Sequence, residues 1–293
     1  RGYIMLVGII LALIVAVLWS LGEVEYSKIS KSEDSSNVYF YQYFTRAVIY
    51  LLVALIFKRY IFGTFVLKDF LCFLPIIMCD LTGSYILNKT VKNGELSSVS
   101  PIMAAYPVVD ILLGIFLLGE HASPLRLILV FVIAISIIVL ASDTEKTDYA
   151  PHPKLGILFA VIYMLLTAFS TYFEKDAYLS NLSVYDLYYY KGIIYFLASI
   201  FFLSSVFIQK KKFRKPDKQI LKGTMITPIG NTFYSFALNY GDMMVVTPLS
   251  SIYSVITNIT SRKVLKEKIT KKESICIGLI LVSTITLLIM GLM

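Results

Sequence analysis

Acidic side chains lie deep inside long apolar segments of this chain. Asp80 falls near the middle of the apolar stretch 66–91, and Asp110 falls inside the stretch 96–118. An ionisable residue in lipid is costly and usually has a functional role. Because burial disfavours the charged form of a carboxyl group, either residue can take up and release a proton. We therefore predict Asp80 and Asp110 as candidates for proton coupling, with a buried salt bridge or helix contact as the alternative.

Two acidic residues share a helical face with aromatic side chains. Trp19, Glu23 and Tyr26 are spaced i, i+4, i+7. Tyr106 and Asp110 are spaced i, i+4, so each set lies on one side of a helix. Aromatic faces beside a carboxylate attract an ammonium group, by about 1–2 kcal/mol for each desolvated ring. The pattern predicts a site for an organic cation.

Further aromatic and hydroxyl residues extend this pattern. Tyr163, Thr167 and Glu174 are spaced i, i+4, i+11, and Tyr253 and Thr257 repeat the tyrosine–aspartate spacing without the acid. The two halves of the chain should therefore treat a ligand unequally. The residues predicted to bind substrate are Trp19, Glu23, Asp80, Tyr106, Asp110, Tyr163 and Tyr253.

Structural explanations compete with each of these assignments. The 21 tyrosines and 19 phenylalanines produce accidental aromatic stripes, and tyrosine at the end of a membrane span is typical of the lipid interface. Acids near the ends of apolar stretches can simply meet water. These acids are Glu23, Glu25, Glu174 and Asp176.

The composition places this chain in a membrane. Of its 293 residues, 57% are hydrophobic and 16% are charged, and the mean hydropathy is +0.76. A soluble domain of this length could not bury so many apolar side chains. The 27 Lys and Arg exceed the 19 Asp and Glu, mostly in polar breaks such as 210–215. There, lipid headgroups rather than nucleic acid are the expected partner.

The patterns of an enzyme are missing from the sequence. Cys72, Cys79 and Cys276 lie in apolar stretches, and His121 and His152 lack metal-ligand spacing. No nucleophile stands beside a paired base, and no Walker A pattern occurs, which excludes ATP hydrolysis by this chain. We expect no metal and no cofactor.

About ten apolar stretches are long enough to cross a bilayer. They lie near 3–27, 38–57, 66–91, 96–118, 124–142, 155–178, 184–208, 218–240, 245–265 and 274–292. The polar segment 142–154 divides them into two sets of five. An odd number in each half reverses the side from which the second half enters the membrane. We predict an all-α integral membrane protein of ten transmembrane helices in two inverted five-helix repeats, 1–145 and 150–293.

The two halves also share a residue pattern. A set of five residues returns 147 positions later in the chain. Gly83, Gly94, Pro101, Tyr106 and Glu120 match Gly230, Gly241, Pro248, Tyr253 and Glu267. Such a duplication within a membrane is typical of a transporter whose substrate binds between the halves.

The repeated segment resembles a known family. The patterns G-E-L-S-S-V-S-P at 94–101, Y-P at 106–107 and L-L-G-E at 117–120 resemble the EamA repeat of the drug/metabolite transporter superfamily. The second copy departs from the family pattern, with Ser254 in place of a proline and Lys266 in place of a glycine. The resemblance implies ten helices, alternating access, and a central cavity lined by the first, third, fourth, sixth, eighth and ninth helices.

This layout puts the acids of the spans on cavity-lining helices. Arg46 and Lys191 match one another on the second and seventh helices, which the layout makes peripheral. They are expected to pair with acids or to extend to the interface rather than to contact substrate. We therefore expect a cavity of net negative charge that favours a cationic or zwitterionic substrate.

The predicted function is secondary transport of a small organic metabolite, an amine or amino-acid-like compound, across the plasma membrane. Transport would be driven by a proton or by the gradient of the substrate, and the chain would act as a monomer or homodimer. The alternatives are a receptor or scaffold that does not transport, or an exporter of nucleotide sugars or drugs. Orientation stays open, because the Lys and Arg bias places both termini outside the cytoplasm while the resemblance implies the opposite.

Overall fold

The structure is a computed structural model that describes residues 2–57, 66–118, 123–142, 150–241, 243–265 and 270–292. Its elements are twelve α-helices. They are α1 (Gly2–Ser32), α2 (Ser35–Phe57), α3 (Leu67–Asn93), α4 (Leu96–Met103), α5 (Tyr106–Leu118), α6 (Pro124–Ser142), α7 (Pro153–Leu179), α8 (Val184–Ile208), α9 (Lys218–Tyr240), α10 (Met243–Ser251), α11 (Tyr253–Val264) and α12 (Lys271–Leu292). Some residues of the sequence patterns lie outside the described residues, namely Gly119, Glu120, His121, Asp242, Lys266 and Glu267.

By length and composition, six helical segments of the described chain are able to cross a membrane. Each of the ten apolar stretches contains a helix, but two stretches contain two. The stretch 96–118 holds α4 and α5, and the stretch 245–265 holds α10 and α11. Pro101 lies inside α4 and Pro248 inside α10. Proline lacks an N–H and disrupts the preceding turn. At the first break, the N–H of Ala105 donates to a carbonyl only three residues back, at 3.1 Å.

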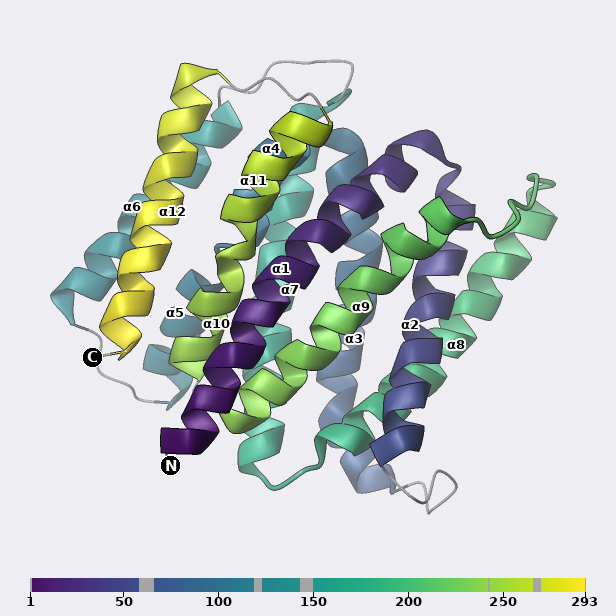
Figure 1. Ribbon diagram of the computed structural model, residues 1–293, viewed down its shortest axis with the longest axis horizontal. Coiled ribbons are helices and arrows are strands. Elements are labelled where there is room, and N and C mark those ends of the chain that lie inside the picture. The colour runs from purple at the N-terminus through teal and green to yellow at the C-terminus, as the bar shows by residue number, and fades with distance from the viewer. Residues whose placement is uncertain are drawn as a thin grey trace.

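Helices of the two halves pack against each other rather than forming separate bundles (Figure 1). The pair α1 and α9 has its counterpart in α7 and α3, while α2 packs on α8 and α6 on α12. In Figure 1, α6 and α12 lie at one edge and α2 and α8 at the other. The four helices α1, α3, α7 and α9 therefore form the middle of the molecule.

Two glycine pairs allow the central helices to cross closely. A Cβ added to Gly156 would lie 2.7 Å from the Cα of Gly94, and one added to Gly8 would lie 3.0 Å from the Cα of Gly241. The first pair joins the start of α7 to the end of α3. The second joins the start of α1 to the end of α9. Each crossing therefore depends on the absence of a side chain at Gly156 and at Gly8, whereas a Cβ at Gly94 or Gly241 would lie 3.5 or 3.6 Å from the opposite glycine Cα, in ordinary contact.

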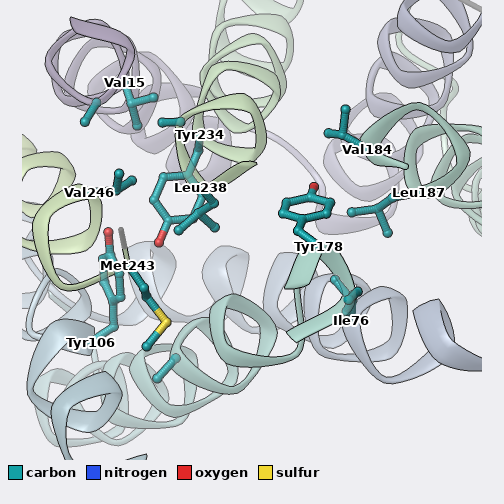
Figure 2. Close-up of a cluster of buried hydrophobic side chains, with 14 of the residues drawn as sticks. Val15, Ile76, Tyr106, Tyr178, Val184, Leu187, Tyr234, Leu238, Met243 and Val246 are labelled. Carbon is teal, nitrogen blue, oxygen red and sulfur yellow. The ribbon is translucent and has the colours of Figure 1, made fainter. Parts of the chain in front are cut away.

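Aromatic and aliphatic side chains fill the space between the helices (Figure 2). Tyr106 of α5 and Tyr234 of α9 lie in this core with Met243 and Val246 of α10. On the outer surface, large apolar side chains are exposed instead, as lipid would require. Examples are Leu13, Leu55, Phe131, Phe201 and Val282.

Candidate functional site

A cavity lies between the two halves of the molecule. The first half contributes side chains from α1 to α5 to its lining, and the second half contributes side chains from α7, α8, α9 and α11. The family resemblance implied that the second and seventh spans, α2 and α8, are peripheral. Both helices do lie at the edge of the fold (Figure 1), but the implied set of lining helices is incomplete, because Arg46 of α2 and Lys191 of α8 also line the cavity. Their long side chains reach inward from helices at the edge of the fold.

Six of the seven predicted substrate-binding residues line this cavity. They are Trp19, Glu23, Asp80, Tyr106, Tyr163 and Tyr253. Asp110 is buried on α5 outside the lining, and its two carboxylate oxygens make no hydrogen bond of ordinary geometry with a described residue, although the Thr247 hydroxyl is close enough to interact with them. Tyr26 is also outside the lining, where its hydroxyl donates to Gln42 at 2.7 Å.

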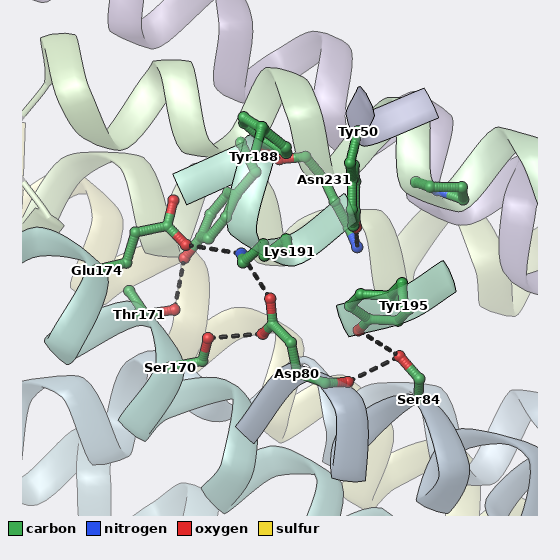
Figure 3. Close-up of polar contacts among 12 residues, drawn as sticks. Tyr50, Asp80, Ser84, Ser170, Thr171, Glu174, Tyr188, Lys191, Tyr195 and Asn231 are labelled. Atoms are coloured by element: carbon green, nitrogen blue, oxygen red, sulfur yellow. Dashed lines mark hydrogen bonds and ion pairs between the residues drawn. The ribbon is translucent and has the colours of Figure 1, made fainter. Parts of the chain in front are cut away.

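An ion cluster joins three helices at one side of the cavity (Figure 3). The Nζ of Lys191 lies 2.6 Å from Asp80 Oδ2 on α3 and 3.4 Å from Glu174 Oε2 on α7. The other Asp80 oxygen accepts a hydrogen bond from Ser170 at 2.6 Å. Two carboxylates thus share one ammonium, and the ionised cluster has one excess negative charge.

Glu23 has a different environment. Its Oε2 accepts hydrogen bonds from Ser100 at 2.7 Å and from Thr257 at 3.4 Å. Although Glu23 is buried, with only 5% of its surface exposed, it forms no ion pair with any described residue. A buried carboxylate of this kind keeps an unused capacity to bind a cation.

Aromatic rings surround this part of the cavity. The indole of Trp19 meets Tyr253 edge-on, with ring centroids 5.6 Å apart, and lies 4.9 Å from the ring of Tyr234. Its Nε1 donates to Asn231 at 2.8 Å, which fixes the orientation of the indole. The predicted combination of aromatic faces and a carboxylate is therefore present in three dimensions, and Tyr234 and Asn231 join it from α9.

The second cation of the cavity is Arg46, which lies 4% exposed on α2. Its guanidinium carbon lies 5.7 Å from the centre of the Tyr195 ring, and its Nε has no hydrogen-bond partner. Among the described residues it forms no ion pair. The signal in the sequence for this position is the match of Arg46 to Lys191 in the repeat.

Two polar contacts beside the cavity repeat across the halves. Tyr195 of α8 and Ser84 of α3 have their hydroxyls 3.1 Å apart. Tyr50 of α2 accepts from the amide of Asn231 on α9, also at 3.1 Å. Tyr50 and Tyr195 match in the repeat, and so do Ser84 and Asn231 (Figure 3).

Within the described ranges, no group of three or more His, Cys, Asp or Glu side chains is arranged to hold a metal ion. The polar groups of the cavity are instead carboxylates, hydroxyls, amides and two cations between aromatic rings. Such an arrangement can bind a charged organic molecule but offers no evident nucleophile with a base.

Comparisons with known proteins give two findings. The sequence model of the EamA-like transporter family matches residues 6–142 and, again, residues 154–289. A solved crystal structure of a protein that is 12% identical superposes with a TM-score of 0.65, over 99% of this chain and 98% of that chain. At this identity the second likeness concerns the fold alone. No match was found among curated proteins.

Proposed function

Since the chain belongs to the EamA-like transporter family, we propose that it is a secondary active transporter of a small organic metabolite with an ammonium group. The substrate is a cation or a zwitterion that binds in the central cavity and crosses by alternating access. The chain is a multi-pass integral membrane protein. The proposal gives it ten spans in two inverted repeats and a place in the plasma membrane.

The observation that carries this proposal is the carboxylate of Glu23, which accepts hydrogen bonds from hydroxyl groups but forms no ion pair with a described residue. It lies in the cavity with Trp19 and Tyr253, whose rings meet edge-on. An ammonium group gains from the formal charge of Glu23 and from the negative faces of the rings. A purely anionic ligand would lose its hydration there without a compensating cation.

The helix packing supports an arrangement in which corresponding helices of the two halves make equivalent contacts. The contact of α1 with α9 corresponds to that of α7 with α3, and both crossings use a glycine pair. In transporters built from inverted repeats, the halves move relative to each other around a site at their interface. The cavity of this chain has lining residues from both halves.

Proton coupling belongs to the same proposal, with Asp80 or Asp110 as the carrier. The two residues differ in their surroundings. Asp80 contacts Lys191 and Ser170, whereas Asp110 is buried without an ion pair to a described residue. A charge at Asp110 would therefore be uncompensated, which favours a site that gains a proton in one step of the cycle.

Counterflow in proteoliposomes tests the proposed function. Liposomes that contain the protein are loaded with unlabelled choline, leucine or glucose 6-phosphate, and uptake of the labelled form of each compound is measured. We expect exchange of the amine or of the amino acid, and none of the sugar phosphate. Glu23→Gln should lower this exchange at least tenfold, because it removes the charge and keeps the shape.

The matched control is Glu25→Gln. Glu25 is two residues away on α1, outside the cavity lining, and pairs with Lys28 at 2.7 Å, so its loss should leave exchange unchanged. Exchange of glucose 6-phosphate that is insensitive to Glu23→Gln would contradict the proposed substrate class. Failure of all three compounds to exchange would favour a receptor or scaffold that does not transport.

A further inference from the structure

The two cations of the cavity are used differently. Lys191 is held by two carboxylates, Asp80 and Glu174. Arg46, at the matching position of the other half, lies over the ring of Tyr195 and within electrostatic range of Asp80, but it forms no ion pair with a described residue. A guanidinium group has five N–H donors in a planar fork. Arg46 is buried and lines the cavity, and its Nε–H has no acceptor among the described residues, which is unfavourable for a buried donor.

The nearby acids do not supply the missing acceptor. Asp80 is occupied by Lys191 through one oxygen and by Ser170 through the other. Glu23 accepts from Ser100 and Thr257, both hydroxyl groups of other helices. The guanidinium is therefore available to a group that enters the cavity.

Charge balance limits what that group can be. With all side chains ionised, the described lining carries the acids Glu23, Asp80 and Glu174 and the bases Arg46 and Lys191. A phosphate dianion would add two negative charges to this surplus, with one free cation to meet them. A carboxylate has a single charge, and its two oxygens match the guanidinium fork.

We propose that Arg46 binds a carboxylate of the substrate, and hence that the substrate is a zwitterion whose ammonium group lies toward Glu23. This inference rests on the proposed function and deepens it by choosing zwitterions over simple amines. Tyr163 connects the two ends of the site, since its hydroxyl is within electrostatic range of both Glu23 and Arg46. Both charged groups line the same cavity.

Matched ligand pairs test the role of Arg46. Leucine is compared with isopentylamine, and phenylalanine with phenethylamine, so each pair differs only in the carboxylate. Binding to the full-length protein in detergent is measured by calorimetry, and counterflow by the same compounds is measured in liposomes. We expect the wild type to bind at least one amino acid tenfold or more tightly than its amine.

Two substitutions of Arg46 separate charge from geometry. Arg46→Gln should bring the amino acid down to the affinity of its amine and leave amine binding within about twofold. Arg46→Lys keeps the charge but loses the planar fork, so its preference for the amino acid over the amine should be intermediate. This variant also keeps the inference testable if Arg46→Gln fails to fold. Lys154→Gln, at an exposed lysine outside the lining, is the control and should keep the wild-type preference.

The outcomes distinguish this inference from the proposed function. If amines bind and exchange but the carboxylate adds nothing, or if Arg46→Gln weakens both members of a pair equally, the carboxylate site is wrong while the proposed transporter stands. If neither amines nor amino acids bind or exchange, both are wrong. A preference for the amino acid that disappears only in the Arg46 variants supports the inference.

Discussion

Lys191 on α8 lies 2.6 Å from Asp80 on α3, so that the ion pair joins the two halves of the molecule beside the cavity. The matching residue, Arg46, is not paired in this way with any described residue. The positions that Asp80 and Glu174 would match in the other half are Thr227 and Tyr26, which carry no charge at neutral pH. The duplication has therefore kept the two cations but retained acids around only one of them.

The first prediction concerns the stability that this pairing provides. Lys191→Met should lower the free energy of unfolding by about 3–5 kcal/mol, because it leaves two carboxylates close together without their shared cation. Unfolding by SDS titration in mixed micelles measures the change.

Adding Asp80→Asn and Glu174→Gln to Lys191→Met should recover much of the loss, since no uncompensated charge then remains. Lys154→Met, at an exposed lysine, is the control and should have little effect. A loss no larger than that of the control would show that Lys191 has no stabilising role.

The sequence predicted most of the helix positions and much of the cavity. Trp19 and Glu23 were found from their spacing, because one helical face is enough to bring them together. The same spacing did not bring Tyr106 and Asp110 into one site: α5 starts just after the helix break, and only Tyr106 lines the cavity. The helical periodicity of a sequence predicts which residues share a helix face, but it does not predict which other helices or cavities that face contacts.

Arg46 shows a second limit of the sequence. Its inward position depends on how α2 packs against α8 and α9, which no local pattern contains. Helix packing also decides the position of Tyr26. Its hydroxyl is hydrogen-bonded to Gln42 of α2 and Asn88 of α3 and does not line the cavity.

The glycine crossings give the second prediction. Gly156→Ala should lower the free energy of unfolding by about 1–3 kcal/mol, because its Cβ would meet the backbone of Gly94 at 2.7 Å and the helices would have to separate. Gly8→Ala, with a closest contact of 3.0 Å to Gly241, should cost less.

Gly278→Ala on α12 is the matched control, because its added Cβ would have no atom within 4 Å. The same SDS titration compares the three variants. Equal stability of Gly156→Ala and Gly278→Ala would mean that α3 and α7 do not cross as closely as described.

The third prediction concerns proton coupling. Asparagine at the coupling position should abolish the pH dependence of net uptake while leaving substrate exchange largely intact, since exchange needs no change of protonation. Asp110→Asn and Asp80→Asn are compared in liposomes across external pH, with Asp69→Asn at the start of α3 as the control. Wild-type pH profiles in both Asp80 and Asp110 variants would exclude these residues as proton carriers.

A polar latch at one end of the apolar helices also joins the halves. We define it as the loop 209–217 between α8 and α9 together with residues 33–37 between α1 and α2. Arg214 bonds Glu33 across the latch and Asp217 within the loop. Lys211 lies 2.9 Å from Asp34. These charged pairs hold the loop over one end of the helices.

Its carboxyl groups make the latch sensitive to acid. Burial alone would raise the pKa of Asp34, but hydrogen bonds from Lys211 and from the N–H of Ser36 outweigh it and hold this pKa below its ordinary value. A hydrogen bond from Arg214 likewise lowers the pKa of Asp217. A carboxyl group whose pKa is lowered by folding stabilises the structure above its ordinary pKa, about 3.9, and loses that effect as the pH falls through the lowered value.

The fourth prediction is that the latch opens in acid and in variants that lack its cation. Arg214→Gln should speed cleavage of the loop 209–217 by Lys-C at neutral pH, because the loop loses both of its Arg214 ion pairs. In the wild type, cleavage by pepsin near Phe213 should rise as the pH falls below about 3.9, after normalisation to a free peptide of sequence 207–218. Lys222→Gln, on an exposed residue of α9 outside the latch, should cleave like the wild type in both assays. If Arg214→Gln is cleaved no faster than this control, and the wild type shows no acid-dependent rise, the ion pairs do not hold the loop in place.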